Sequence, residues 1–190
     1  MLNRRQVLSS GAAWWAAAPG LQAQTTLNRG VQRRPGHILA IGGAEDRGTQ
    51  SAVLRRFIAL SGGESARIVV LTAASGEPEP VAANYLAAFQ QLGVTQCLAV
   101  DARNLEEANH AFNAARLLEA DGIFITGGDQ RRLMATIGQS DFARSMRVAF
   151  HMRGACIAGT SAGAAALSRQ MLAEGSTPSW PEIGIGADHG

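Results

Sequence analysis

Short apolar segments alternate with longer amphipathic segments along most of this chain, and this alternation limits the folds open to it more than any other feature. Glycine or another small residue ends nearly every apolar segment. The apolar segments are HILAIGG (37–43), ARIVVLTAA (66–74), QCLAVDA (96–102), GIFITGG (122–128) and ACIAGT (155–160). Apolar runs of this kind are typical of parallel strands that are buried on both faces of a sheet. The sequence therefore predicts a mainly parallel β-sheet.

The segments between these strands have the spacing of amphipathic helices. In residues 49–60, for example, Val53, Phe57 and Leu60 recur at helical intervals. Helices are predicted over 49–60, 80–93, 104–120, 129–137 and 140–154. Ser140 is expected to cap the last of these helices. Strands that alternate with helices indicate a three-layer α/β/α fold with helices on both faces of the sheet.

The pattern fades after Ser168. Residues 173–190 are rich in turn-forming residues, and they end without a strand or helix that would close the sheet. We therefore expect one α/β domain over residues 36–190, with its C-terminal part missing.

The first residues of the chain have the layout of an export signal. Arg4 and Arg5 precede an apolar stretch that is too short to span a bilayer, and Ala23 is a suitable cleavage position. The adjacent arginines resemble a twin-arginine signal. We expect residues 1–23 to be this signal and 24–35 to be a linker. The mature protein is then expected to be periplasmic or extracellular, without membrane attachment.

The charges of the remaining chain are balanced, which excludes some classes of partner. Two of the 17 basic residues lie in the expected signal, so 15 basic residues oppose 15 acidic ones. The remaining chain therefore has no excess of positive charge of the kind that binds nucleic acid. Cys97 and Cys156 lie in apolar segments and are expected to be buried thiols, not a disulfide. No histidine lies at ligand spacing from them, so they predict no metal site.

The segment CIAGTSAGAAALS (156–168) carries a candidate nucleophile. It matches the G-x-S-x-G pattern with Ser161 at its centre, after a predicted strand and before small residues that suit a tight turn into a helix. In such an elbow the N–H of Ala162 would face a developing oxyanion. The same residues also fit a plain strand–helix turn in which Ser161 caps the helix.

Two further strand ends carry polar residues. ITGGDQ (125–130) offers glycine N–H groups and the side chains of Asp129 and Gln130, which suit an oxyanion donor and a substrate hydrogen bond. Asp129 fits equally well as a helix N-cap. IGGAEDR (41–47) suits an anion-binding nest, or its charged residues pair with one another. It lacks the spacing of dinucleotide-binding and P-loop motifs. Ligands of open parallel sheets bind at this edge, so we expect the three stretches to form one site.

The motifs GGAED, TGGDQ and GTSAGA, in this order at three strand ends, resemble those of the cyanophycinase-like serine peptidases. The same family includes the aspartyl dipeptidase called dipeptidase E. The resemblance runs from about residue 37 to about residue 175. It implies a fold like that of the class I glutamine amidotransferases, which carry cysteine at the elbow where this chain has Ser161.

The resemblance also implies roles for individual residues. Ser161 corresponds to the nucleophile, and Ala162 with Gly128 of the glycine turn corresponds to the oxyanion hole. Gln130, with Asp129 beside it, corresponds to the lining of the substrate pocket. The implied substrate is a peptide or polymer of the aspartyl-arginine type, which cyanophycinases cut into β-linked aspartyl-arginine units. No metal or organic cofactor is implied.

The base and the acid of a catalytic triad are less well matched. The family's histidine lies in a D-Q-H-like context that this sequence lacks, so we expect the base beyond Gly190. His189 is the single histidine after Ser161, and it is a weak candidate. Glu174 fits the family's placement of the acid, and Glu182 is the second choice. Of the other histidines, His37 is assigned to the start of a strand, and His110 and His151 are assigned to helices.

Three other functions remain open from the sequence. One is an aspartyl dipeptidase of the same family. Another is an α/β-hydrolase-type esterase, which shares the G-x-S-x-G pattern. The third is a binding protein of the same fold that has lost catalysis. The sequence leaves the oligomeric state open, a homodimer included.

Overall fold

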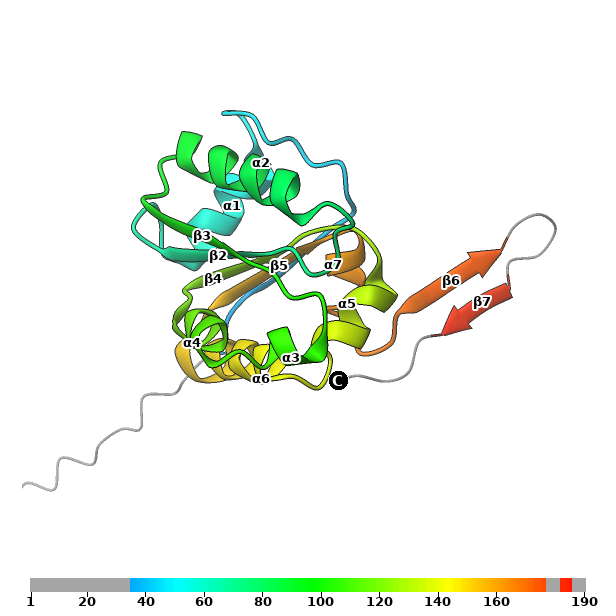
Figure 1. Cartoon of the computed structure of the whole chain (residues 1–190). Coiled ribbons are helices and arrows are strands. Elements are labelled where there is room, and N and C mark those ends of the chain that lie inside the picture. The colour runs from blue at the N-terminus through cyan, green and yellow to red at the C-terminus, as the bar shows by residue number, and fades with distance from the viewer. Residues whose placement is uncertain (1–34, 177–181, 186–190) are drawn as a thin grey trace, which may run out of the picture. The chain divides into compact units, whose positions relative to one another are not determined.

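A five-stranded parallel sheet forms the centre of the computed structural model, which describes residues 35–176 and 182–185 (Figure 1). The expected signal, residues 24–34 of the expected linker, and His189 lie outside the described residues. The strand order is β1-β5-β4-β2-β3. The strands are β1 (Ile38–Ile41), β2 (Arg67–Leu71), β3 (Gln96–Val100), β4 (Gly122–Ile125) and β5 (Cys156–Thr160). All five predicted strands are therefore confirmed.

The sheet order brings together the chain segments that follow β1, β4 and β5. β5 lies between the other two strands, with Ile41 paired to Thr160 and Ile125 paired to Gly159. Because all three strands are parallel, their carboxyl ends meet at one edge of the sheet. The three motif-bearing turns therefore lie side by side, as the sequence predicts.

Helices cover both faces of this sheet (Figure 1). They are α1 (Ala52–Ser61), α2 (Pro78–Gln91), α3 (Leu105–Ala108), α4 (Ala111–Glu119), α5 (Gln130–Ile137), α6 (Asp141–Val148) and α7 (Ala162–Ala165). Strand residues alternate between two cores. Ile68, Val70 and Phe124 pack with α1 and α2, whereas Val69 and Ile123 belong to the core that includes residues of α4, α5 and α6. The chain thus has the predicted three-layer α/β/α fold.

Local signals in the sequence account for several helix boundaries. The side chain of Ser51 accepts a hydrogen bond from the N–H of Leu54 and caps α1, which ends at Gly62 with φ 111°. Ser140 caps α6 as predicted, by accepting from the N–H of Ala143. Such capping bonds satisfy N–H groups that have no partner within the helix.

The prediction of one helix over 104–120 is wrong, since two helices occupy this segment. α3 ends at Asn109, whose side-chain N–H donates to the carbonyl of Leu105. The carbonyl oxygen of the Asn109 side chain accepts from the N–H of Asp141, at 2.8 Å, and so ties this break to the start of α6. His110 then precedes α4 in an extended conformation. A tertiary contact overrides the helical periodicity here.

The segment after α6 and the C-terminal region also differ from expectation. α6 continues into a π-helical turn, η1 (Ala149–Arg153), which ends at Gly154 with φ 77°. After residue 168, where we expected turns, β6 (Leu172–Ser176) and β7 (Glu182–Ile185) form an antiparallel pair. This pair is a separate two-stranded sheet and does not join the central sheet. Cys156 is buried and Cys97 is partly buried, and both are free thiols.

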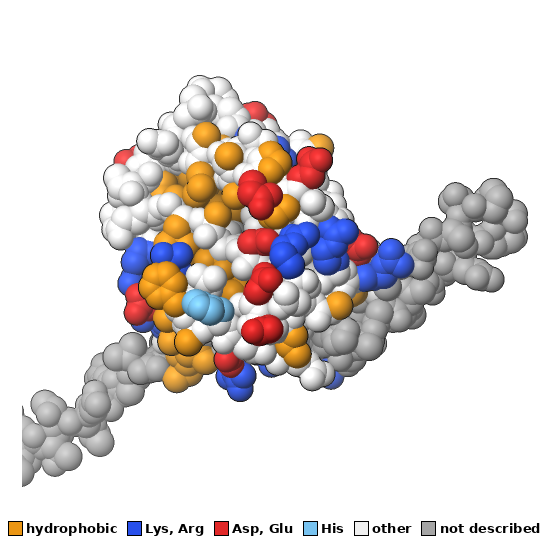
Figure 2. Space-filling model, viewed as in Figure 1, with side chains coloured by type: hydrophobic (Ala, Val, Ile, Leu, Met, Phe, Trp, Pro, Cys, Tyr) orange, Lys and Arg blue, Asp and Glu red, His pale blue; other side chains and the backbone are white. Residues whose placement is uncertain are grey.

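The surface carries charges of both signs. On the face shown in Figure 2, acidic and basic side chains are interspersed, with hydrophobic side chains between them. Among the described residues, no helix is long and apolar enough to cross a bilayer.

Candidate active site

Ser161 has the backbone conformation of a strained turn. Its φ of 52° and ψ of −115° lie in a region that residues with a side chain rarely adopt, and such strain costs about 1–3 kcal/mol. The surrounding chain holds it in place. The N–H of Ser161 donates to the carbonyl of Ile41 at 2.9 Å, and its own carbonyl accepts from the N–H of Ala165 at 3.0 Å. The exposed Ser161 is thus held on a sharp turn between β5 and α7.

The small residues of the elbow are required by close packing. A Cβ atom on Gly163 would lie 2.4 Å from the carbonyl oxygen of Ile125, and one on Gly159 would lie 2.3 Å from the carbonyl oxygen of Gly163. Both distances are far below van der Waals contact. The G-x-S-x-G pattern therefore allows α7 to pack directly on the ends of β4 and β5.

The hydroxyl of Ser161 does not cap α7. Its side chain makes no capping hydrogen bond to that helix, in contrast to Ser51 and Ser140 at α1 and α6. The plain capping interpretation of the sequence is therefore not supported. Ala162 occupies the first position of α7, where backbone N–H groups have no partner within the helix.

The glycine turn after β4 lies against Ser161. A Cβ atom on Gly127 would be 3.3 Å from the Cβ and 3.8 Å from the Oγ of Ser161. Gly128 has φ +146°, and a Cβ there would lie 2.0 Å from the carbonyl oxygen of Ala74. The turn is fixed by the N–H of Asp129, which donates to the same carbonyl at 2.9 Å. The two proposed sources of oxyanion donors, Ala162 and the turn containing Gly128, thus adjoin Ser161.

Asp129 and Gln130 have other partners in this structure. The carboxylate of Asp129 caps α5 by accepting from the N–H groups of Arg131 and Arg132, and these bonds are the main reason that its pKa is lowered. The side-chain amide of Gln130 donates to the carbonyl of Leu172 at 3.0 Å and so connects α5 to β6. Neither residue lines the cavity that contains Ser161.

That cavity has a volume of about 200 Å³ and is built from all three strand ends and from α2. Its lining comprises Gly43, Ala44, Glu45, Arg47, Val81, Tyr85, Gly127, Thr160 and Ser161. Glu45 belongs to the IGGAEDR stretch that the sequence places at this site, whereas the contribution of Tyr85 was not expected from the sequence. Tyr85 is the single tyrosine of the chain, and a tyrosine on the buried side of a helix normally needs a partner for its hydroxyl.

Glu45 is the buried carboxylate of this cavity, with only 3% of its side chain exposed. The hydroxyl of Thr160 donates to its Oε2 at 2.5 Å, and the hydroxyl of Tyr85 donates to its Oε1. The Nε of Arg47 lies 3.5 Å from Oε1, and its guanidinium lies 4.6 Å above the centre of the Tyr85 ring. The pairing of charges within IGGAEDR that the sequence left open is therefore present between Glu45 and Arg47.

The pKa of Glu45 reflects two opposing effects. Burial raises it, but the hydrogen bonds from Thr160 and Tyr85, a local backbone bond and the charge of Arg47 lower it by more. The pKa of Glu45 is therefore below its ordinary value, and the group is a carboxylate at neutral pH. Burial and the adjacent carboxylate raise the pKa of Tyr85, so that its hydroxyl keeps its proton.

None of the described histidines lines this cavity. The carbonyl of His37 accepts from the N–H of Ile157 near the start of β5, and His151 lies on η1 before β5. Both are therefore at the amino end of the strands, opposite Ser161. His110 is exposed at the start of α4.

The candidate acids lie on the C-terminal pair of strands. Glu174 of β6 is paired with Gly184 of β7, and Glu182 of β7 is paired with Ser176. The described residues therefore bring Ser161 and its flanking turns together, but they do not bring a histidine to that serine.

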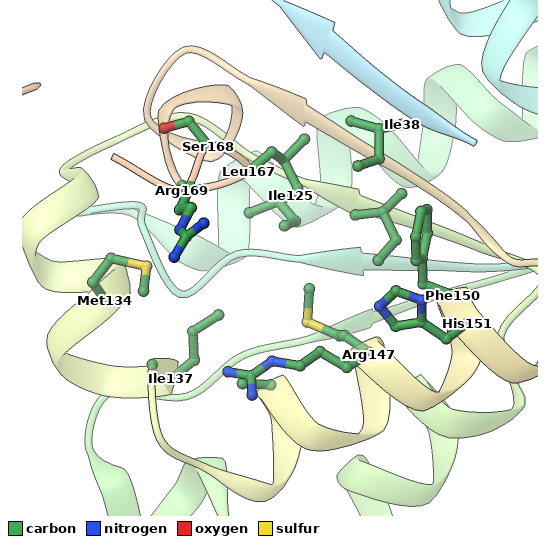
Figure 3. Close-up of a pocket in the computed structure, with 15 residues that line it drawn as sticks. Ile38, Ile125, Met134, Ile137, Arg147, Phe150, His151, Leu167, Ser168 and Arg169 are labelled. Atoms are coloured by element: carbon green, nitrogen blue, oxygen red, sulfur yellow. The ribbon is translucent and has the colours of Figure 1, made fainter. Parts of the chain in front are cut away.

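A larger cavity, of about 550 Å³, lies between the sheet, the helices α5 and α6, the turn η1 and the residues that follow α7. Figure 3 shows that apolar side chains such as Ile125, Ile137 and Leu167 surround it, together with Arg147 and His151. The lining of this cavity does not include Ser161. His151 thus belongs to a different part of the molecule from the candidate nucleophile.

Comparisons with known proteins show which family the chain belongs to. The family model of peptidase family S51 matches residues 38–182. Cyanophycinases of Trichormus variabilis and Geminocystis herdmanii are 32% and 31% identical to the chain over 163 and 144 residues, which are 86% and 76% of it. These matches cover 55% and 53% of the two relatives, so the chain spans about half of their length.

A solved peptidase from an acI-B1 Actinobacterium has a similar fold, with a TM-score of 0.62 at 20% identity. The match covers 74% of this chain and 60% of that structure. The match of the family model and the identity to the cyanophycinases place all three motif-bearing strand ends within one family. The chain belongs to peptidase family S51.

Proposed function

We propose that the chain provides the nucleophile and the oxyanion-binding part of a serine peptidase of the cyanophycinase type. The observation that carries this proposal is the strained backbone of Ser161, which is exposed on a sharp turn beside two glycine-rich strand ends. Strain of this kind is found mainly at functional sites, because folding alone gains nothing from it.

The proposed reaction is acyl transfer to Ser161. Its Oγ forms a bond to the carbonyl carbon of the scissile amide while a base accepts the hydroxyl proton. The N–H of Ala162 and an N–H of the turn containing Gly128 stabilise the resulting oxyanion. The C–N bond then breaks, the amine leaves with the proton from the base, and water later hydrolyses the acyl-enzyme.

The base and the acid of this reaction are proposed to come from outside the residues that surround Ser161 in the structure. None of the described histidines lines its cavity, so the base would be a histidine outside the described ranges. Glu174 remains our proposed acid, with Glu182 as the second choice.

The proposed substrate is an aspartyl peptide or polymer, with release of β-aspartyl-arginine units as the first choice. Two relatives that carry the name cyanophycinase support this choice. The guanidinium of Arg47, which is paired with Glu45, is half-exposed in the same cavity as Ser161, and its remaining N–H donors suit a substrate carboxylate. Cleavage of aspartyl dipeptides is the alternative within the family.

The test is a comparison of substrates with the full-length protein and its Ser161→Ala variant. We expect hydrolysis of a β-aspartyl-arginine peptide by the parent protein alone, with less activity toward a simple ester or an α-linked dipeptide. An ester preference would favour an esterase. Absence of both hydrolysis and labelling by a fluorophosphonate would favour a binding protein, since an unactivated serine does not react.

We further propose that the protein is exported, with residues 1–23 removed. The arginine pair followed by a short apolar stretch supports this location.

A further inference from the structure

We infer that Glu45 is a positioning residue for Ser161, because its carboxylate holds Thr160, the residue that precedes the nucleophile. This inference rests on the proposed role of Ser161. It assigns a function to the GGAED stretch, which neither the oxyanion hole nor the nucleophile uses.

The link between Glu45 and the elbow is short and buried. Thr160 is the last residue of β5 and is 3% exposed. Its hydroxyl donates to Oε2 of Glu45 at 2.5 Å, across 115 positions of the sequence. The strained turn starts at the next residue. A fixed side chain at Thr160 therefore anchors the point from which the backbone turns toward Ser161.

The opposite side of the carboxylate is held by α2. The hydroxyl of Tyr85 donates to Oε1 of Glu45, and Tyr85 is only 2% exposed. Its ring packs against Phe124 of β4, with 4.8 Å between the ring centres. Glu45 thus connects the end of β5 to a rigid aromatic core, and its position is set by two different elements.

The loop that carries Glu45 also lies beside the nucleophile, and Gly43 and Ala44 line the same cavity as Ser161. Gly43 and Ala44 both have positive φ, of 113° and 52°. A Cβ on Gly43 would be 3.4 Å from the Cβ of Ser161. The loop therefore forms one side of the cavity that contains Ser161. The carboxylate of Glu45 connects this loop to the end of β5, the strand that Ser161 follows.

The charges that face the carboxylate fit a positioning role. Arg47 provides the cation, 3.5 Å from Oε1. A buried carboxylate is unfavourable unless it is paired and hydrogen-bonded, and here both oxygens have a hydroxyl donor. In the described part of the chain, the carboxylate of Glu45 accepts from Thr160 and Tyr85 and makes no hydrogen bond to Ser161, so we infer that it acts through these neighbours.

The test uses Glu45→Gln in the full-length protein, with Asp46→Asn as the matched control. Asp46 is the neighbouring carboxylate, and its side chain accepts from the nearby N–H of Gly48 within the same loop. The readouts are kcat and KM on a β-aspartyl-arginine peptide, the rate of fluorophosphonate labelling at Ser161, and Tm. We expect Glu45→Gln to lower kcat and the labelling rate by about 10- to 100-fold, as for a displacement of about 1 Å, with KM nearly unchanged. Asp46→Asn is expected to leave both rates unchanged.

Two substitutions at Thr160 show whether Glu45 acts through it. Thr160→Val removes the hydroxyl with little change of shape, whereas Thr160→Ser keeps the hydroxyl and is expected to restore most of the rate. The losses in Glu45→Gln and Thr160→Val should add to less than their sum in the double variant, because both disrupt the same link. If Glu45→Gln fails to fold, the two Thr160 variants carry the test.

The outcomes separate this inference from the proposed function. In one outcome the parent protein is active, and Glu45→Gln changes Tm but leaves kcat and the labelling rate within about twofold. This outcome overturns the positioning role and leaves the proposed function intact. Additive losses in the double variant also overturn it. A parent protein that neither labels nor hydrolyses, like Ser161→Ala, overturns the proposed function and this inference together.

Discussion

The backbone N–H of Ser161 donates a 2.9 Å hydrogen bond to the carbonyl oxygen of Ile41. Ser161 directly follows β5, and Ile41 is the last residue of the neighbouring parallel strand β1. The last residues that pair between these two strands are Thr160 and Ile41. The bond extends the strand ladder by one position into the strained turn. The elbow is thus part of the sheet's hydrogen-bonding pattern and not a separate loop, which explains how a strained residue is kept in one conformation.

Two substitutions of Ser161 measure the backbone strain of the turn independently of the serine hydroxyl. Ser161→Gly should increase the free energy of unfolding relative to Ser161→Ala by about 1 kcal/mol, because glycine adopts φ 52° without the penalty of a Cβ atom. Chemical denaturation of the two variants measures this difference. Equal stabilities would show that the turn is not strained.

The close packing of the elbow predicts a loss of stability in Gly163→Ala. The new Cβ would meet the carbonyl oxygen of Ile125 at 2.4 Å, a backbone atom that cannot easily move. We expect a loss of about 1–3 kcal/mol by overpacking. Gly42→Ala is the control, since its Cβ would have no heavy atom within 4 Å. A Gly163→Ala protein as stable as this control would contradict the packing described here.

Acid pH is expected to destabilise the protein through Glu45. Its pKa is lowered in the folded state, because hydrogen bonds and Arg47 outweigh the effect of burial. The unfolded state therefore binds the proton more readily, so the stabilisation is present above the ordinary value of 4.5 and is lost as pH falls through the lower folded pKa. Urea unfolding at a series of pH values should show this decline.

Asp121 contributes to the same loss of folding stability at acid pH. Its pKa is also lowered, mainly by the hydrogen bond from Arg67, with some opposition from burial. Glu45→Gln should therefore reduce the decline without abolishing it. An unchanged pH profile in Glu45→Gln would mean that its carboxylate is not stabilised by the fold.

The proposed export signal predicts a specific effect of its arginine pair. Arg4→Lys with Arg5→Lys should trap the precursor in the cytoplasm, because the twin-arginine pathway distinguishes the pair from other basic residues. The chain offers a matched control in Arg33 and Arg34, a second pair that lies after the expected signal. Cell fractionation followed by immunoblotting measures the export of each double variant, and the control variant is expected to be exported normally. Normal export of the first double variant would exclude this pathway.

The elements that the sequence predicted are those that depend on local pattern. The five strands follow from uninterrupted apolar runs, and the elbow at Ser161 follows from glycine and alanine at close spacing. The break at Asn109 was missed because it depends on a bond to the N–H of Asp141, which helical periodicity does not encode. The pair of β6 and β7 was missed because LAEGS has no alternation of apolar residues and EIGI is a short segment among turn-forming residues.

The candidate site was predicted only where its residues lie at strand ends. Ser161 and the Gly127–Gly128 turn adjoin one another as expected, because the strand order places β4 beside β5. Glu45 could be recognised only as a member of a charged cluster. Its contacts to Thr160 and Tyr85 join residues 115 and 40 positions away in the sequence, so three-dimensional structure was needed to find them.

The most direct test of the central claim is to identify the residue that reacts with a fluorophosphonate in the full-length protein. Mass spectrometry of the labelled protein should place the probe on the peptide that contains Ser161. Ser161→Ala should abolish both labelling and hydrolysis of a β-aspartyl-arginine peptide, with a loss on the order of 10⁶ in kcat. A label on another residue, or hydrolysis by Ser161→Ala at a rate within tenfold of the parent protein, would contradict the account.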